Sequence, residues 1–385
     1  MSEFSALKPG GTIGILGGGQ LARMLALAAA RLGLKCHIFA PEPDSCAFGV
    51  VRRATLAEYG DEAALARFAE EVDVITYEFE NVPAETAAFL SSRRRVLPDP
   101  SVLATTQDRL TEKDFVASLG IATAPYAGVS AMGDVRAAVE KIGLPAVLKT
   151  RRFGYDGKGQ VKIGVKDDPA RAWRSLGEAP AILERYIAFT REVSIVAARA
   201  ADGEVVTFDI TENEHADHIL KFSRVPAKVS PAVAEEGRRI AQAIAEALNY
   251  VGTLAVELFV VEDGGDERLL VNEIAPRVHN SGHWTIDGAS VSQFEQHVRA
   301  VAGWPLGKPV RRGRIEMINL IGAEIDDYAK WLEVPNAYLH VYGKPGARPG
   351  RKMGHVTRVM PETAAAGDAR LAKPAKPRGK PKARR

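Results

Sequence analysis

VNEIAPRVHNSGHW, residues 271–284, is the stretch from which the fold and the site of this 385-residue chain are best inferred. It begins as the end of an apolar strand and then brings together a set of mixed polar groups: Arg277, His279, Asn280, Ser281 and His283. Burying unpaired donors and charges is costly, so this is not an ordinary core segment. Pro276 and Gly282 interrupt regular backbone, as is common where sites are built. We interpret the stretch as functional rather than as a solvated polar loop.

Just before it, residues 253–261 and 268–274 read as two strands joined by an acidic turn with two central glycines. If the turn centres on those glycines, Glu257 lies opposite Asn272 or Glu273, with side chains about 5–7 Å apart. Two carboxylates and an amide on one sheet face repel unless a cation lies between them, and such oxygen ligands suit Mg²⁺. The alternative is that they point to opposite faces and are solvated. The apolar neighbours of Glu257 favour a metal site.

A strand at residues 145–149 ends in Lys149, and the loop TRRFGYDGKGQ, residues 150–160, follows it. Its glycines and the cationic side chains around them describe a hairpin loop that folds over phosphates. It is not a P-loop, because no Gly-Lys-Ser/Thr leads into a helix. A glycine-rich surface hairpin is the alternative.

Near the start of the chain, a strand at 12–16, a glycine turn, a helix at 21–32 and a strand at 35–40 form a βαβ unit. The glycine turn stands at a helix N-terminus, which suits a phosphate. Gly17 and Gly19 match a looser dinucleotide fingerprint, but the acid expected after the second strand is poorly placed. We therefore favour phosphate binding or a structural use over a nicotinamide site.

A third strand of this region, at residues 72–77, ends in the acidic segment EFEN, residues 78–81. Ligands of open parallel sheets bind at the carboxyl ends of the strands, where this segment lies. A solvated acidic loop is the alternative.

The composition is that of a soluble globular protein, with 46% hydrophobic and 26% charged residues. The net charge of +3 arises in the tail, where residues 361–385 hold eight Lys and Arg against two Asp and Glu. The rest of the chain holds 43 Lys and Arg against 46 Asp and Glu. The basic pI therefore indicates no nucleic-acid-binding fold, and the tail itself is predicted to be disordered. No secretory start, membrane span or disulfide framework is recognisable, so we expect a cytoplasmic protein.

A strand-end lysine, a glycine-rich hairpin, a hinge with a carboxylate and paired carboxylates on adjacent strands together resemble the ATP-grasp superfamily. Within it, GYDGKGQ at 154–160 and NEIAPRVHNSGHW at 272–284 look like the N5-carboxyaminoimidazole ribonucleotide synthetase family of purine biosynthesis. The resemblance runs from about residue 10 to residue 360 and leaves out the basic tail.

The resemblance implies an α/β chain, α+β overall, with the ATP-grasp fold. It places an N-terminal Rossmann-like parallel-sheet domain at residues 1–125 and the ATP-grasp domain at 126–310, with a lid at about 145–205. A C-terminal β-rich subdomain follows at 311–360, and then the disordered tail at 361–385. The family also implies a homodimer.

The resemblance further implies that ATP and bicarbonate convert 5-aminoimidazole ribonucleotide into its N5-carboxylated product through carboxyphosphate. Mg²⁺, or Mn²⁺ in its place, would be bound by Glu257 and Glu273. The implied ATP-binding residues are Arg109, Lys149, Gly154, Tyr155, Asp156, Gly157, Lys158, Gly159, Gln160, Glu184, Arg185, Tyr186, Ile187, Glu192, His215, Asn272 and Glu273. The implied residues for the ribonucleotide are Gln20, Leu21, Glu78, Asp156, Asn280, Lys344, Arg351 and Lys352, the last three clamping its 5′-phosphate.

Three implied catalytic side chains complete this expectation. Lys149 would offset charge on the transferring phosphoryl group, and Arg277 would stabilise bicarbonate and carboxyphosphate. His279 would orient a group or shuttle a proton. No nucleic acid or membrane is required.

Three alternatives stay open at this point. Another ATP-grasp ligase, such as a transformylase or biotin carboxylase, would share the ATP-binding part of the chain but not the motif at residues 280–283. A nicotinamide-dependent dehydrogenase would rest on the first glycine turn and leave Lys149, Glu257 and Glu273 unexplained. A non-catalytic binding protein would use the carboxylate pair only structurally.

Overall fold

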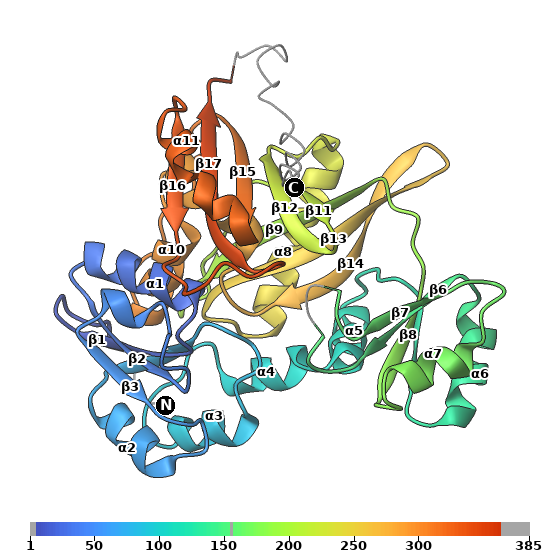
Figure 1. Cartoon of the computed structure of the whole chain (residues 1–385), viewed down its shortest axis with the longest axis horizontal. Coiled ribbons are helices and arrows are strands. Elements are labelled where there is room, and N and C mark those ends of the chain that lie inside the picture. Colours follow the sequence, from blue (N-terminus) through green and yellow to red (C-terminus); the bar gives the residue numbers. More distant parts are fainter. Residues whose placement is uncertain (1–4, 155–156, 363–385) are drawn as a thin grey trace, which may run out of the picture.

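Three sheets make up the part of the protein that the structure describes. The computed structural model describes residues 5–154 and 157–362. Figure 1 shows a parallel sheet at the lower left, a small sheet with two helices at the lower right, and a large sheet across the upper half.

The first sheet is parallel, with strand order β3-β2-β1-β4. Its strands are β1 (Thr12–Leu16), β2 (Lys35–Ala40), β3 (Arg53–Leu56) and β4 (Val74–Tyr77). Its helices are α1 (Gln20–Arg31), α2 (Glu62–Glu70) and α3 (Ala84–Ser91), with a short 3-10 turn, η1 (Phe48–Val50). The side chain of Asp61 accepts a hydrogen bond from the Ala64 amide and so caps α2.

Two further helices, α4 (Pro100–Thr106) and α5 (Arg109–Ser118), connect the first sheet to the second. The second sheet has the order β5-β8-β6-β7, and its neighbouring strands are antiparallel. Its strands are β5 (Tyr126–Val129), β6 (Ala146–Thr150), β7 (Gln160–Ile163) and β8 (Ala181–Arg185), and its helices are α6 (Met132–Ile142) and α7 (Pro169–Ser175).

The third sheet has nine strands in the described residues, ordered β14-β13-β9-β11-β12-β15-β17-β16, with β10 beside β9. The strands are β9 (Arg191–Arg199), β10 (Val205–Thr207), β11 (Thr211–Ala216), β12 (Ile219–Val225), β13 (Gly252–Asp263), β14 (Asp266–Ala275), β15 (Arg314–Ile321), β16 (Ala337–Val341) and β17 (Lys352–Met360). The helices are α8 (Pro231–Ala247), α9 (Thr285–Gly288), α10 (Gln293–Ala302) and α11 (Tyr328–Leu332), with the 3-10 turns η2 (Asn280–Gly282) and η3 (Gly322–Asp327).

This third sheet is continuous across residue 310, because β12 pairs with β15 from Phe222–Ile318 to Val225–Ile315. The strands expected to form a C-terminal subdomain thus extend the same sheet as β13 and β14. The small second sheet begins with β5, before residue 145, and β9 already belongs to the large sheet. The domain limits given above remain predictions.

The expected α/β class, the N-terminal parallel sheet and the β13–β14 hairpin are all found in the structure. Sequence patterns did not identify the strands β3, β5, β11 and β12 or the helices α4, α7 and α9. The polar residues 212–215 lie within strand β11. No helix of the described residues has the length and apolar character needed to cross a membrane.

Phe68 of α2 is fully buried against the first sheet, with its ring centroid 5.0 Å from that of His37 and 5.4 Å from that of Phe39. Phe68→Ala should lower the free energy of unfolding by about 3–5 kcal/mol, because the lost contacts leave a cavity. Denaturant unfolding measures the loss. Leu56→Ala, at a side chain that is 57% exposed, is the control and should change stability by less than about 0.5 kcal/mol. Equal effects of the two substitutions would contradict this description of the core.

Candidate active site

The candidate active site is organised around the β13–β14 hairpin. Glu257 and Glu273 lie directly opposite each other, and the register shifts next to this pair, between Glu257 and Leu258. Because directly paired residues of antiparallel strands project from the same face, the two carboxylates are close neighbours. The predicted facing of Glu257 and Glu273 is therefore correct, and the alternative of opposite faces is excluded.

Nitrogen-bearing side chains of the protein contact both carboxylates. The Arg109 guanidinium, at the start of α5, lies 2.8 Å from Glu273, and the His279 Nε2 atom lies 3.1 Å from Glu257. Burial alone would raise the pKa of Glu257, but the hydrogen bond from His279 and the electrostatic effect of the His279, His215 and Lys352 side chains outweigh it and lower that pKa to about 2. Glu257 is therefore ionised at neutral pH.

The residues present fit a magnesium ion held jointly with phosphates. Besides the two carboxylates, the buried Asn272 Oδ1 atom accepts no hydrogen bond from any described residue. Within the described residues no group of three or more His, Cys, Asp or Glu side chains could hold a metal. Mg²⁺ commonly binds through one or two carboxylates plus substrate phosphates and water, so a pair of carboxylates is a sufficient protein contribution.

Helix α5 brackets the Asn272–Glu273 pair with two buried charged residues. The Lys113 Nζ atom donates to the Val271 carbonyl at 3.0 Å, and the Ile274 amide donates to Glu112 at 2.8 Å. Burial and the nearby charge of Glu273 raise the pKa of Glu112 to about 8. Sequence analysis missed both residues, which read as ordinary surface charges of a helix.

Lys149 and Glu184 form the adjoining part of the site, on neighbouring strands β6 and β8. The Lys149 Nζ atom lies 2.9 Å from Glu184 Oε2, and the Lys113 Nζ atom lies 3.9 Å from the same oxygen. Burial would raise the pKa of Glu184, but the charges of these two lysines lower it to about 2. The expected ATP residues thus form two ion pairs, Arg109–Glu273 and Lys149–Glu184, and the charge of Glu184 also acts on Arg109.

The loop between β6 and β7 reaches across to the large sheet. Its base is closed by a hydrogen bond from the Thr150 amide to the Gly159 carbonyl, at 2.8 Å. At Gly157, whose φ is +77°, a β-carbon would come within 2.6 Å of His218, in the β11–β12 turn. Tyr155 and Asp156, expected to bind ligands, lie outside the described residues. Gly154 and Lys158 belong to the same β6–β7 loop, and Gln160 begins β7.

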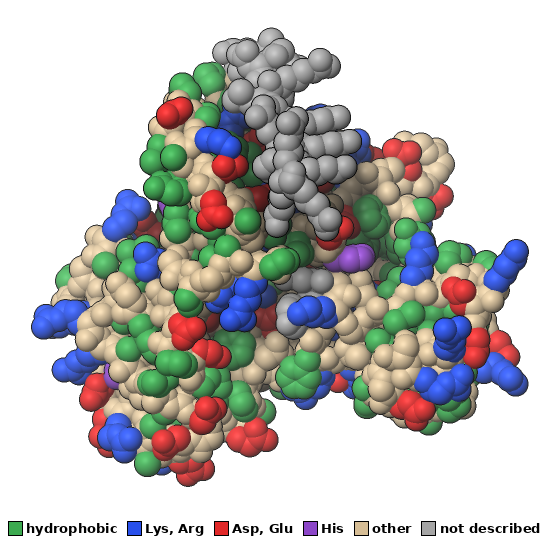
Figure 2. Space-filling model, in the orientation of Figure 1, with side chains coloured by type: hydrophobic (Ala, Val, Ile, Leu, Met, Phe, Trp, Pro, Cys, Tyr) green, Lys and Arg blue, Asp and Glu red, His purple; other side chains and the backbone are tan. Residues whose placement is uncertain are grey.

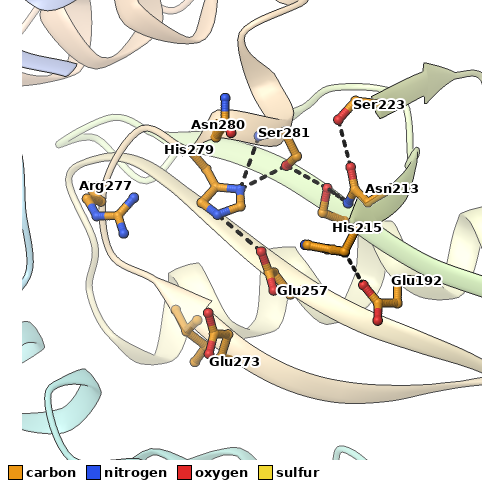
Figure 3. A network of polar contacts seen from close by, with 12 residues as sticks. Glu192, Asn213, His215, Ser223, Glu257, Glu273, Arg277, His279, Asn280 and Ser281 are labelled. Atoms are coloured by element: carbon orange, nitrogen blue, oxygen red, sulfur yellow. Dashed lines mark hydrogen bonds and ion pairs between the residues drawn. The ribbon is translucent and has the colours of Figure 1, made fainter. Parts of the chain in front are cut away.

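The hinge after β8 and the facing strands contribute the remaining expected ATP residues. Tyr186 is 41% exposed, and the Lys162 Nζ atom lies 3.7 Å from its ring centroid. His215 of β11 pairs with Glu192 of β9, as Figure 3 shows. Arg185 packs its guanidinium near the Ile142 carbonyl, at the end of α6, and Ile187 follows Tyr186 in the irregular segment before β9.

Arg277 pairs with Glu80 through two contacts, one of them 2.9 Å long from Nη2 to Oε1. Burial would raise the pKa of Glu80, but the charge of Arg277 lowers it to about 2. Glu80 belongs to the acidic segment after β4, and its position at the end of a strand was the sequence feature that could have indicated a functional role. Its partner, however, lies 197 residues away in sequence.

The first glycine turn holds a carboxylate of the protein itself. Glu78 accepts hydrogen bonds from the Gly19 amide at 2.5 Å and from the Ala22 amide at 2.9 Å. A β-carbon at Gly17 would meet the Glu78 side chain at 2.4 Å, which explains the glycine there. The helix N-terminus therefore serves a structural purpose, one of the two uses expected from the sequence.

A cavity of about 350 Å³ adjoins this turn. It is lined by Gly17, Gly18, Gly19, Glu42, Asp44, Ser45, Cys46, Tyr59, Glu78, Phe79, Lys344 and Arg351. Burial lowers the pKa of Lys344 to about 8, the charge of Cys46 opposing and that of Arg351 adding to the shift. Three expected ribonucleotide residues, Glu78, Lys344 and Arg351, thus share one cavity.

The other expected ribonucleotide residues do not line this cavity. Gln20 and Leu21 begin α1 just beyond the glycine turn, and Leu21 is buried. Asn280 exchanges two hydrogen bonds with Asn319 of β15, at 3.0 and 2.9 Å. Lys352 begins β17 and acts electrostatically on Glu257 and His215, so it lies toward the carboxylate pair.

Three known sequence families match successive parts of the chain. Residues 11–107 match the ribonucleotide synthetase preATP-grasp domain, residues 114–294 the ATP-grasp domain, and residues 316–369 the phosphoribosylaminoimidazole carboxylase C-terminal domain.

Two bacterial relatives that match nearly the whole chain carry the same name. The chain is 50% identical over 363 residues to the N5-carboxyaminoimidazole ribonucleotide synthase of Brucella melitensis, covering 94% of this chain and 99% of that protein. It is 49% identical over 349 residues to the synthase of the same name from Pseudomonas aeruginosa, covering 90% and 93%. This chain belongs to the N5-carboxyaminoimidazole ribonucleotide synthase family.

Solved structures of synthases from this family have the same fold. The enzyme from Thermus thermophilus has a TM-score of 0.84 at 46% identity, covering 90% of this chain and 93% of that one. The enzyme from Aspergillus clavatus, solved with ADP and 5-aminoimidazole ribonucleotide, has a TM-score of 0.83 at 29% identity, covering 92% and 94%. The ATP-grasp fold, the ligase class, the use of ATP and the carboxylation of 5-aminoimidazole ribonucleotide in purine biosynthesis are thereby confirmed. The dehydrogenase and non-catalytic alternatives are excluded.

Glu112→Ala should lower the free energy of unfolding by about 1–3 kcal/mol, because the buried Ile274 amide loses its acceptor. It should also raise the KM for ATP, because the strand segment that carries Asn272 and Glu273 loses one of the two hydrogen bonds that hold it to α5. Glu112→Gln is the matched control: it keeps an acceptor oxygen and resembles the neutral carboxyl that a pKa of about 8 implies. Denaturant unfolding and steady-state kinetics measure both effects. Equal losses in the two variants would show that the acceptor is not what matters.

Proposed function

We propose that the residues around the β13–β14 hairpin carry out the family's carboxylation with bicarbonate as the carbon source and with carboxyphosphate as the activated form. The observation that carries this assignment of residues is the direct pairing of Glu257 with Glu273, beside the ionic cluster of Arg109, Lys149 and Glu184. Such a cluster can neutralise both a metal ion and the phosphates that it binds.

ATP would lie between the small sheet and the β13–β14 hairpin, covered by the loop at 154–160. Lys149 and Arg109 would exchange their carboxylate partners for phosphate oxygens, which offsets charge on the transferring γ-phosphoryl group. Glu257 and Glu273 would hold Mg²⁺, with Asn272 offering an amide oxygen beside them. The ion would supply charge neutralisation at the phosphates. Closure of the loop would keep water away from the reactive intermediate.

Bicarbonate would bind near Arg277. Its oxygen attacks the γ-phosphorus, ADP leaves, and carboxyphosphate forms. The guanidinium of Arg277 is held by Glu80 and directed so that a fixed positive charge is available to the oxyanions of bicarbonate and carboxyphosphate. The His279 Nε2 atom faces Glu257 and orients that carboxylate.

The ribonucleotide would occupy the 350 Å³ cavity at the first glycine turn. Lys344 and Arg351 would bind its 5′-phosphate, with Lys352 beside them at the start of β17. The exocyclic amine then attacks the carboxyl carbon of carboxyphosphate, or of CO₂ released from it, and inorganic phosphate leaves. Glu78 lines the same cavity, whereas Gln20, Leu21 and Asn280 lie outside it and would contact the parts of the ribonucleotide that extend beyond it.

A cytoplasmic location and a homodimer are also proposed, both on the basis of the family. Purine biosynthesis draws on ATP and bicarbonate, which the cytoplasm supplies, and both cysteines of the described chain are free thiols. A homodimer would have a mass of twice 41.5 kDa in solution.

ADP release measured with Mg-ATP and bicarbonate, with and without 5-aminoimidazole ribonucleotide, tests the proposed reaction. We expect release to rise sharply with the ribonucleotide and to yield an acid-labile carboxylated product. Omitting bicarbonate should abolish both. ATP turnover that ignores the ribonucleotide or bicarbonate would refute the proposed substrates.

Glu273→Gln tests the metal assignment within the same assay. The variant should fold, but its kcat should fall more than about 100-fold, beyond the loss typical for an outer partner of a metal ligand. Arg109 would lose its carboxylate partner without any change of side-chain shape. Near-normal turnover, with an unchanged Mg²⁺ requirement, would remove Glu273 from the metal site.

The pKa of Lys344 leads to a pH dependence. Above a pKa of about 8 the side chain is neutral and no longer attracts a phosphate, so kcat/KM for the ribonucleotide should decline above pH 8. The decline should approach about tenfold per pH unit, as for the loss of one proton. Lys344→Arg keeps its charge in this range and should remove the decline. A decline that persists unchanged in Lys344→Arg would assign it to another group.

A further inference from the structure

A continuous line of buried hydrogen bonds runs from strand β12 to the carboxylate Glu257. Its members are Ser223 of β12, Asn213 of β11, Ser194 of β9, Ser281 of η2 and then His279. In Figure 3 the labelled members Ser223, Asn213, Ser281 and His279 follow one another from the upper right to the centre of the site. Ser194, Ser223 and Ser281 are completely buried, and Asn213 nearly so. We call these four residues, without His279, the hydroxyl–amide chain.

The hydrogen bonds of this chain have a direction. The Ser223 hydroxyl donates to Asn213 Oδ1 at 2.8 Å, and Asn213 Nδ2 donates to the Ser194 hydroxyl at 2.9 Å. An amide nitrogen cannot accept, so the oxygen of Ser194 must receive that bond. Ser194 then gives its only proton to Ser281 Oγ, at 2.7 Å.

Ser281 has one hydroxyl proton left to place, and His279 Nδ1 lies 2.9 Å from its oxygen. With Ser194 already donating to Ser281, that proton goes to Nδ1. The Ser281 backbone amide is also directed at Nδ1, at 3.4 Å, which is independent support for Nδ1 as an acceptor. A neutral imidazole with an accepting Nδ1 carries its proton on Nε2.

At the other side of the ring, Nε2 lies 3.1 Å from Glu257 Oε1. A carboxylate can only accept, so an Nε2–H group there forms a hydrogen bond, whereas a bare Nε2 would face it with a lone pair. The hydrogen bond on one nitrogen of a histidine commonly decides what the other nitrogen does. Residues that hydrogen-bond to a metal ligand fix the orientation of that ligand in this way.

We propose that the hydroxyl–amide chain holds His279 as the neutral Nε2–H tautomer and thereby positions Glu257 for the metal ion. Ser281, Ser194, Asn213 and Ser223 are positioning residues, since they act through His279. The inference rests on the proposed role of Glu257 as a metal ligand, but the tautomer itself is a property of the protein without ATP or metal.

The first experiment reads the tautomer directly. The full chain, labelled with ¹⁵N-histidine and free of nucleotide and metal, is compared with Ser281→Ala by ¹⁵N NMR; the signals of His279, one of eight histidines, are identified by their loss in His279→Gln. We expect one protonated and one bare nitrogen, with the proton on Nε2, and a mixture of tautomers in Ser281→Ala. An Nδ1–H or doubly protonated ring in the unmodified protein, or an unchanged tautomer in Ser281→Ala, overturns the proposal.

The second experiment reads the consequence for the metal. Binding of Mn²⁺ in the presence of ADP, and the Mg²⁺ concentration that half-saturates turnover, should weaken about 10–100-fold in Ser281→Ala, as for the outer partners of metal ligands. The KM for the ribonucleotide should stay constant. Ser223→Ala, three links from the ring, should show a smaller effect in the same direction. An altered tautomer with unchanged metal binding would overturn the link to Glu257.

Thr106→Val is the matched control, because it removes a buried hydroxyl bonded only within its own helix, to the Val102 carbonyl at 3.0 Å. It should change neither the tautomer nor the Mn²⁺ affinity. Glu257→Gln tests the metal-ligand role of Glu257 separately, because unchanged metal binding in that variant would refute this role. The His279 tautomer, measured without metal, tests the hydroxyl–amide chain alone. Circular dichroism verifies that each variant is folded.

Discussion

Two carboxylates opposite each other on adjacent strands are the constraint on which this site depends. Glu257 and Glu273 cannot both be ionised at that separation unless positive groups surround them. Arg109, at the start of a helix that precedes the small sheet, supplies positive charge beside Glu273, and the charge of Lys352 acts on Glu257. His279, in the segment that follows the hairpin, lies within hydrogen-bond distance of Glu257. These contacts tie the hairpin to two other parts of the chain.

The same principle extends through the buried cluster. Lys113 and Lys149 share Glu184, and Glu112 adds an acceptor beside Glu273. Because the cations already have partners, the folded protein does not hold unpaired charge while it awaits a ligand. In the proposed complex with ATP, phosphates would replace carboxylates as partners of the same cations.

The sequence predicted what depends on local pattern. The β13–β14 hairpin followed from apolar runs around a glycine turn, and the facing of Glu257 and Glu273 followed from its register. Local pattern did not identify Glu112, because a Glu in a helix is ordinarily solvated and only its distant acceptor role distinguishes it. Arg277 was recognised, but its partner Glu80 was not, since 197 residues separate them. Short strands such as β5 and β12 became strands through pairing with distant neighbours, which propensity does not report.

The carboxylate of Glu78 at the start of α1 has a consequence for how a ligand lies in the adjoining cavity. The cavity lining contains this buried carboxyl group, which already accepts hydrogen bonds from the amides of Gly19 and Ala22, together with the cations Lys344 and Arg351. Because Glu78 occupies the amides at the helix N-terminus, a phosphate in this cavity would be attracted by the two side-chain cations and not by the glycine turn.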